Sequence, residues 1–233
     1  MNTFTYNSIA SSAYGIKVEY CPDYYVPQRE QTRIHVPGRD GDLVLDTGAY
    51  KNFDRSYDIY FNAKSSKFQT VASSVVTWLC GTGGYHRLED TYETDIYMMA
   101  MVENQSALSN FMNYMGRARV TFNCKPQKWL KSGETEVTLT SGATTNNAYM
   151  PCFPVFRLTG NGTLTVNGNT ITVANNYGKT ITIDCETQNA YTGTDNRNAD
   201  ITVTGDFPYL KSGNNTITFT NSTCKMTPRW WRL

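Results

Sequence analysis

Residues 36–43 read Val-Pro-Gly-Arg-Asp-Gly-Asp-Leu, a stretch in which two turn-forming dipeptides follow one another. Pro37 fixes its own φ at the value that a β-turn needs, and Gly38 supplies the positive φ of the next position in a type II turn. Asp40 and Gly41 form a dipeptide that favours hairpin connections. The stretch therefore predicts the rigid tip of a β-hairpin.

Strand-like runs lie on both sides of this tip. Residues 32–36 precede it and residues 43–45 follow it, and both runs are rich in residues that strands favour. Further along, residues 53–61 and 94–102 are typical of strands. Residues 117–124 alternate apolar and polar side chains, and we expect Pro126 to end that strand.

Two helical patterns lie among these strands and favour ordinary core packing. In the first, apolar residues recur at helical spacing, with Ser65 or Ser66 as N-cap and Gly81 at the end; they are Phe68, Val71, Ala72, Val75, Val76 and Leu79. The second is shorter, with Ser106 as N-cap and Gly116 as its stop; its apolar residues are Leu108, Phe111, Met112 and Met115. Together with the strands, they predict an antiparallel sheet with two helices on one side.

The chain changes character near residue 133, after which Thr, Asn and Gly dominate. Asn167 and Gly168 form a dipeptide that is typical of a type I′ hairpin turn. Many short strand-like runs separated by turn residues predict an all-β sandwich; the runs are 136–140, 155–159, 163–166, 169–173, 180–184, 200–204 and 215–220. We therefore expect an α+β domain over residues 1–133 and an all-β domain over residues 134–233.

Composition excludes some functions and leaves others open. The 233 residues carry a net charge of +1, and only 18% of them are charged, so the chain offers no basic field for nucleic acid. Aromatic residues make up 13% and include 16 Tyr, a residue common in interfaces. An assembly protein and a Tyr-rich sheet surface are equally compatible with this count.

The first residues, Met-Asn-Thr-Phe-Thr-Tyr, lack the basic and apolar regions of a signal peptide, and no run approaches the length of a membrane span. We therefore expect a protein made in a cytoplasm and not held in a membrane. In that reducing compartment, free and mostly buried thiols are expected for the six widely spaced cysteines; they are Cys21, Cys80, Cys124, Cys152, Cys185 and Cys224.

Candidate catalytic and metal-binding groups are few, and each has a plainer interpretation. His35 beside the turn is expected to be a surface residue of a strand. Asp184 and Glu186 share one face of a strand and could serve acid–base chemistry, but an acidic strand end is the commoner arrangement. The oxygen-rich stretch 195–200 could hold Ca²⁺, although a surface turn is favoured. The sequence thus predicts no catalytic residue, no metal site and no cofactor.

Several stretches resemble the distal tail proteins of long-tailed, non-contractile bacteriophages (siphophages). Residues 33–43 resemble the hairpin of that family, and residues 117–126 resemble the strand that closes its N-terminal domain. In the second part, further stretches are similar to the family's C-terminal domain; these are residues 154–156, 181–184, 205–210, 213–215 and 228–233. The order and spacing of the motifs carry the resemblance across nearly the whole chain.

The resemblance implies a ring-forming N-terminal domain and a galectin-like β-sandwich. In the family, six copies form a ring, single or as two stacked rings, that joins the tail tube to tail-tip and receptor-binding proteins. It implies no catalysis, and DNA is only a transient passenger through the channel. The expected location is the tail tip of the virion, after assembly in the host cytoplasm.

Exposed turns and paired aromatic residues are the expected contacts between copies; these are Tyr24, Tyr25, Pro37, Gly38, Arg39, Asp40, Gly41, Trp230 and Trp231. For Trp230 and Trp231, an equal alternative is that one ring packs back onto its own domain while the other lies flat on the surface.

A carbohydrate-binding module is the main rival function, because exposed tyrosines of a sandwich can stack on sugar rings; the candidates are Tyr149, Tyr177, Tyr191 and Tyr209. Some family members insert a separate carbohydrate-binding domain, for which this chain is too short.

Overall fold

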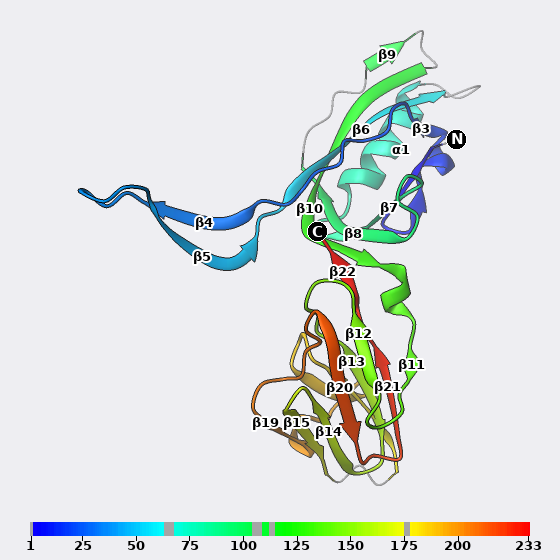
Figure 1. Cartoon of the computed structure of the whole chain (residues 1–233). Helices are drawn as coiled ribbons and strands as arrows, with labels where there is room; N and C mark the ends of the chain where they lie inside the picture. Colours follow the sequence, from blue (N-terminus) through cyan, green and yellow to red (C-terminus); the bar gives the residue numbers. More distant parts are fainter. Residues whose placement is uncertain (1, 63–67, 104–108, 112–114, 175–177) are drawn as a thin grey trace. The chain divides into compact units, whose positions relative to one another are not determined.

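The computed structural model describes residues 2–62, 68–103, 109–111, 115–174 and 178–233 (Figure 1). The chain divides into two compact units, residues 1–128 with Leu233, and residues 129–232. The division falls a few residues before the change of composition near residue 133. Each unit has its own buried apolar cluster.

Unit 1 is built on an antiparallel sheet. In its described part the strands run in the order β2-β1-β7-β8-β10-β6-β3, and β9 pairs with β10. Their bounds are β1 Phe4–Tyr6, β2 Ile9–Ala10, β3 Ile16–Val18, β6 Phe53–Asn62, β7 His86–Asp90, β8 Ile96–Val102, β9 Ser109–Phe111 and β10 Met115–Leu130. A 3₁₀ turn, Ser11–Tyr14, connects β2 and β3.

Helix α1 (Phe68–Cys80) covers one face of this sheet, as Figure 1 shows. Its first expected apolar residue, Phe68, is its first residue, and the helix ends before Gly81, while both expected N-caps lie outside the described residues. Trp78 packs among Phe4, Tyr6 and Tyr14 of the sheet side, and its Nε1–H donates to the Tyr6 carbonyl at 3.1 Å. Burial of this aromatic cluster holds helix and sheet together.

The second expected helix is wrong where the structure describes it. Residues Ser109–Phe111 form strand β9, and Met115 begins β10, with Met115 opposite Phe111. The rest of that pattern, residues 104–108 and 112–114, lies outside the described residues. Isolated helices of about two turns are unstable, so pairing with a long neighbouring strand decides the local structure.

Strand β10 also corrects the expected end at Pro126. It continues through Pro126 to Leu130. The ladder between β6 and β10 ends at Cys124. Pro126 therefore lies beyond that ladder, where its missing N–H removes no hydrogen bond to β6.

A separate hairpin, here called the arm, consists of β4 (Arg29–Ile34) and β5 (Leu43–Tyr50), which pair with each other (Figure 1). All side chains of these two strands are exposed except that of Tyr50, which is partly buried. The arm extends the strand-like runs that the sequence predicts around residues 36–43.

Unit 2 is made of two packed sheets, ordered β11-β21-β13-β16-β17-β18 and β12-β20-β14-β15-β19 in the described part. Its strands are β11 Val137–Thr138, β12 Thr144–Asn147, β13 Val155–Thr159, β14 Gly162–Val166, β15 Asn169–Val173, β16 Thr180–Asp184, β17 Asn189–Thr192, β18 Asp195–Asn196, β19 Ile201–Thr204, β20 Gly213–Phe219, β21 Thr223–Thr227 and β22 Trp231–Arg232. Short 3₁₀ turns span Lys131–Glu134 and Asn198–Asp200.

Alternation of side chains along these strands builds the core of unit 2. Phe156 and Leu158 of β13 and Ile171 and Val173 of β15 all lie in one buried cluster, while the residues between them, Arg157 and Thr172, are more exposed. The turn between β14 and β15 has φ of 52° at Asn167 and 98° at Gly168, as the expected type I′ turn requires. Turn chemistry and a period of two therefore predicted seven strands of this unit, whereas β12, β17, β18, β21 and β22 correspond to no expected run.

None of the helices in the described part is long and apolar enough to cross a membrane.

Candidate interface surfaces

The tip of the arm contains the turn that the sequence predicts. The Arg39 N–H donates to the Val36 carbonyl at 3.2 Å, and Gly38 has φ of +79°, which together make a type II turn. Gly41 also has a positive φ, +77°. A side chain with a Cβ would be strained at both glycines. The tip is therefore a defined loop that holds Arg39 and Asp40 in solvent.

The register of the arm gives it two unlike faces. Opposite residues in an antiparallel pair share a face, and alternate residues along a strand lie on opposite faces. The apolar face carries Thr32, Ile34, Leu43 and Leu45; the polar face carries Gln31, Arg33, Val44 and Asp46. Ile34, Leu43 and Leu45 are 40%, 39% and 51% exposed, so the described residues leave much of the apolar face open to solvent.

The polar face is held together by an ion pair at the base of the arm. Arg29 Nε lies 2.5 Å from Asp46 Oδ2, and the Gly48 N–H donates to Asp46 Oδ1 at 2.8 Å. The hydrogen bond from Arg29 and the backbone hydrogen bond from Gly48 lower the pKa of Asp46 to about 2. Gln31 Nε2 also donates to Asp46 Oδ2 at 3.2 Å, so the polar groups near the base of this face are paired within the hairpin.

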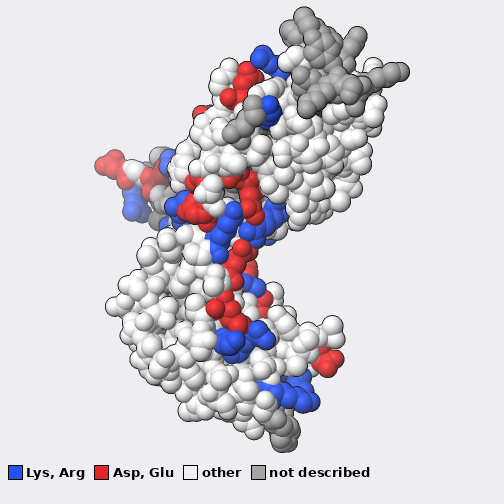
Figure 2. All heavy atoms as spheres, turned by 90° about the vertical axis from the view of Figure 1, so that its right-hand side faces the viewer, with Lys and Arg blue, Asp and Glu red and all other residues white. Residues whose placement is uncertain are grey.

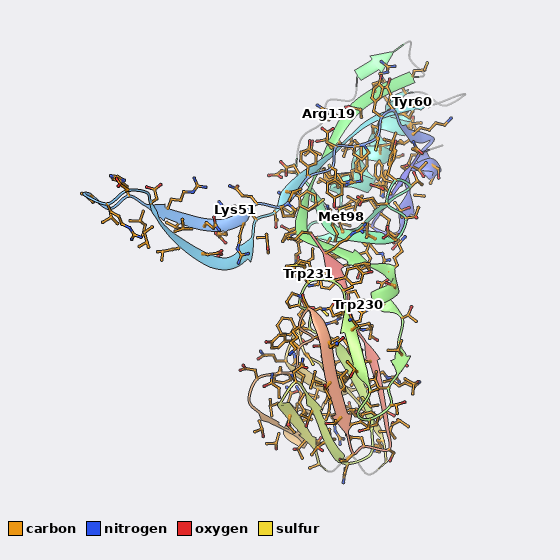
Figure 3. The ribbon with its side chains drawn as sticks, in the orientation of Figure 1. Lys51, Tyr60, Met98, Arg119, Trp230 and Trp231 are labelled. Atoms are coloured by element: carbon orange, nitrogen blue, oxygen red, sulfur yellow. The ribbon has the colours of Figure 1, made fainter. Side chains whose placement is uncertain are left out.

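Tyr24 and Tyr25 lie at the root of the arm, just before β4. Tyr24 is 62% exposed and Tyr25 is 38% exposed. The Lys51 N–H donates to the Gln28 carbonyl at 2.8 Å and closes the root, where Figure 3 labels Lys51. The expected pair of interface tyrosines thus sits beside the arm.

Trp230 and Trp231 (Figure 3) are partly buried and pack against the core of unit 2. Trp231 Nε1–H donates to the Pro151 carbonyl at 2.9 Å, and the Trp230 ring lies 6.5 Å from that of Tyr149. The Trp230 carbonyl accepts the Leu130 N–H at 2.9 Å. Both rings therefore pack back onto their own unit.

The candidate acid–base residues of unit 2 are engaged by one arginine. Arg229 donates to both oxygens of Asp184 at 2.8 Å and to Glu186 Oε2 at 3.2 Å. Burial would raise the pKa of Asp184, but the hydrogen bonds and charge of Arg229 outweigh it and lower that pKa. A carboxylate held ionised by a bidentate arginine is a structural tie between the end of β16 and the last residues of the chain.

The other polar candidates are surface groups. His35 Nδ1 lies 3.6 Å from Asp42 Oδ1 at the exposed arm tip, with side chains 76% and 46% exposed. In the 195–200 stretch, Asp200 pairs with Arg197 at 2.6 Å, and Asn198 accepts the Ala190 N–H at 2.6 Å. Among the described residues, no group of three or more His, Cys, Asp or Glu is placed to hold a metal ion.

Exposed aromatic rings of unit 2 form a small patch that sequence reasoning found only in part. Tyr209 is 40% exposed and lies 6.1 Å from the ring of Phe153, which is 46% exposed. Tyr149 is 36% exposed, Tyr191 is partly buried, and Tyr177 lies outside the described residues. Phe153 was missed because a single Phe beside two prolines has no periodic pattern.

Known proteins similar to this chain are phage tail components. Residues 148–231, most of unit 2, match the family model of the siphovirus-type tail component, C-terminal domain. Unit 2 is therefore similar to the C-terminal domain of siphovirus-type tail components. No curated protein matches the chain significantly by sequence.

Solved structures extend the likeness to nearly the full length of the chain. A crystal structure of Dit from phage SPP1, described as a paradigm of the hub adsorption apparatus of phages that infect Gram-positive bacteria, matches with a TM-score of 0.78 and 13% identity, over 97% of each chain. A chain of the phage p2 baseplate, in its activated conformation with Ca, matches with a TM-score of 0.57 and 10% identity, over 100% of this chain and 98% of that one. The same baseplate with Sr gives a TM-score of 0.53 at 10% identity, over 97% of each chain.

These matches bear on the expectations in different ways. The resemblance to distal tail proteins, which the sequence motifs carried, is confirmed by the family match and the shared fold. The β-rich architecture is confirmed as well. The contacts expected of the arm tip, the tyrosines and the tryptophans remain predictions.

Proposed function

We propose that this chain is the structural hub of a siphophage tail tip. In this proposal, six copies form a ring, single or stacked as two, that joins the tail tube to tail-tip and receptor-binding proteins. The tail-component family of unit 2 and the fold shared with a phage hub protein support this role. The chain acts as a scaffold and not as an enzyme, and it joins the virion during assembly in the host cytoplasm.

The observation that carries the ring is the apolar face of the arm. An isolated two-stranded hairpin is marginally stable in water, and exposed apolar faces mark interaction sites. The arm exposes Ile34, Leu43 and Leu45 on one side, while Gln31 and the Gly48 N–H both donate to Asp46 on the other. The partner proposed for this face is a second copy of the chain. Head-to-tail contacts between copies produce a ring when their rotation closes.

Electrostatics is compatible with a channel through which DNA passes without being held. The net charge is +1, and Figure 2 shows mostly uncharged residues on the visible surface of each unit. Binding to the DNA backbone depends on many Lys and Arg contacts with phosphates. DNA is therefore proposed as a transient passenger, in line with the family resemblance.

Light scattering behind a sizing column, at several protein concentrations, tests the ring. We expect the mass of six or twelve chains for the native protein. Deletion of residues 38–42, or Arg39→Ala, should weaken the ring and leave the fold of the monomer intact. An unchanged hexamer mass for the deletion variant would exclude the arm tip as a contact.

Matched variants of the two arm faces sharpen this test. Leu43→Ser with Leu45→Ser removes the apolar face, and Gln31→Ser with Arg33→Ser changes the opposite face of the same strands. We expect the first pair to shift the mass to a monomer and the second pair to keep the ring. If both pairs behave alike, the apolar face is not what joins the copies.

Carbohydrate binding is the second candidate, favoured by the exposed pair Phe153 and Tyr209. Aromatic faces of this kind can stack on sugar rings. A glycan array with the native protein and with Phe153→Ala/Tyr209→Ala tests it. Signals that vanish in the double variant would support this function, whereas an empty array would remove it. A strict monomer with a positive array would place this function ahead of the ring.

A further inference from the structure

A buried lysine lies at the root of the arm. The Lys128 side chain of β10 is fully buried, with 0% exposure. Its Nζ donates to the Tyr25 carbonyl at 3.3 Å and lies 3.8 Å from the centroid of the Tyr24 ring and 5.8 Å from that of Phe53. Within the described part of the chain, these contacts are a carbonyl and two aromatic rings, and none is a carboxylate.

The three partners of Lys128 come from the two segments that join the arm to the sheet, here called its limbs: the incoming limb before β4 and the outgoing limb between β5 and the start of β6. Tyr24 and Tyr25 precede β4 on the incoming limb, and Phe53 begins β6 after the outgoing limb leaves β5. The hydrogen bond from Lys51 to Gln28 joins the same two limbs. The ammonium group thus lies between the two points at which the arm leaves the body of unit 1.

The positive charge of the buried Lys128 ammonium requires that these particular groups surround it. A buried ammonium is unfavourable unless polar or aromatic groups replace its water, and the face of an aromatic ring attracts a cation electrostatically. Tyr24 is 62% exposed, so one face of its ring covers Lys128 while the rest meets solvent. If the incoming limb moved away, Lys128 would lose its carbonyl and one of its rings together.

We propose that Lys128 is a positioning residue, whose caged ammonium fixes the root of the arm and thereby the direction of its tip. The role belongs to the arm of a single chain and holds whether or not the copies form a ring. Lys125 offers a contrast on the same strand, because it is exposed and its Nζ lies 5.1 Å from the ring of Tyr85. The Tyr85 hydroxyl accepts from Asn52 Nδ2 at 2.6 Å, between β5 and β6, but the ammonium of Lys125 lies over the Tyr85 ring and not between the two sides of the arm.

Amine labelling of the native chain tests the cage directly. An amine-reactive acetylating reagent should modify Lys128 slowly in the native protein and about tenfold faster in Tyr24→Leu, because the covering ring is gone. Tyr24→Phe should label like the native protein, and Lys125 should label at one rate in all three. Equal labelling of Lys128 in the native protein and in Tyr24→Leu would overturn the cage.

The distance between spin labels tests the positioning role. Labels attached to Cys80 and to Arg39→Cys, in a Cys21→Ser background diluted with unlabelled protein, report the position of the tip relative to α1. The remaining thiols should not react, because burial raises their pKa to about 12; they are Cys124, Cys152, Cys185 and Cys224.

Lys128→Met should broaden this distance distribution about twofold or more, because a neutral side chain lacks the attraction to Tyr24. Lys125→Met is the matched control and should leave the distribution unchanged. Tyr24→Leu, at an exposed position, should broaden the distance distribution too. This variant replaces Lys128→Met in the test if Lys128→Met does not fold. Unchanged widths in Tyr24→Leu or in a folded Lys128→Met, or equal broadening in the control, would overturn the proposal.

Discussion

Gly116 lies in β10 beneath the stacked rings of Phe61 and Phe68, whose centroids are 5.5 Å apart. A Cβ at this position would lie 2.4 Å from an atom of the Phe61 ring and 2.7 Å from one of Phe68. The residue that the sequence suggested as a helix stop is therefore a close contact between a strand and two buried rings.

We expect Gly116→Ala to destabilise unit 1 by about 1–3 kcal/mol, the usual cost of overpacking a core. Urea unfolding followed by hydrogen exchange of β6 and β10 measures the change. Gly83→Ala is the control, because nothing lies within 4 Å of a Cβ there. Equal stability of the two variants would show that the rings move apart freely.

The buried pair of Arg55 and Asp90 makes unit 1 sensitive to acid. Their side chains are 2% and 1% exposed and lie 2.6 Å apart, and the Tyr57 hydroxyl donates to Asp90 at 2.7 Å. Burial would raise the pKa of Asp90, but the charge of Arg55 and the hydrogen bonds it receives outweigh burial and lower that pKa. The stabilisation is thus present above the unfolded pKa of about 3.9 and is lost as the pH falls through the folded value.

Asp90→Asn should lower the stability of unit 1 near neutral pH by about 3 kcal/mol, because the buried Arg55 would lose its shorter ion pair and keep only Glu93 at 3.3 Å. The variant should also lose part of the acid dependence below pH about 4. Urea midpoints of unit 1 between pH 3 and pH 7 measure both effects. A variant with the same slope against pH as the native protein would contradict this assignment.

At the scale of elements, periodicity worked where strands are short and separated by clear turns. Strands β13, β15 and β16 have the expected bounds, because alternation and Gly-Asn turns act locally. The pattern around residues 108–115 misled, because a few apolar residues fit a helical stripe as well as a strand that pairs with β10. β9 pairs with the start of β10 just after it in the chain, and β10 is in turn held by its long ladder with β6.

Hydrogen exchange of the arm provides a prediction for this element. In dilute monomer, the amides of β4 and β5 should exchange quickly, because a hairpin without a packed face is marginal. At concentrations where copies associate, the same amides should become protected, while β6 and β10 stay protected throughout. Exchange of the arm that does not change with concentration would argue against contact between copies.

The whole molecule consists of two units with separate cores. Residues 129–232 contain both sheets of unit 2 and their apolar cluster. Produced alone, this fragment should fold cooperatively, because its buried residues come from within it. A dispersed NMR spectrum with the amide protection of the full chain is the expected result, and a disordered spectrum would show that unit 2 depends on unit 1.

The sequence by itself determined what acts over a few residues. It identified the type II turn at the arm tip, the type I′ turn at Asn167, the helix after Phe68, and the tail-component likeness, because turn chemistry and hydrophobic period are local properties. Tertiary structure alone decided which faces are buried and which charges are paired. The apolar face of the arm follows from strand register, and the buried Arg55 and Lys128 follow from partners many residues away, which no local pattern encodes.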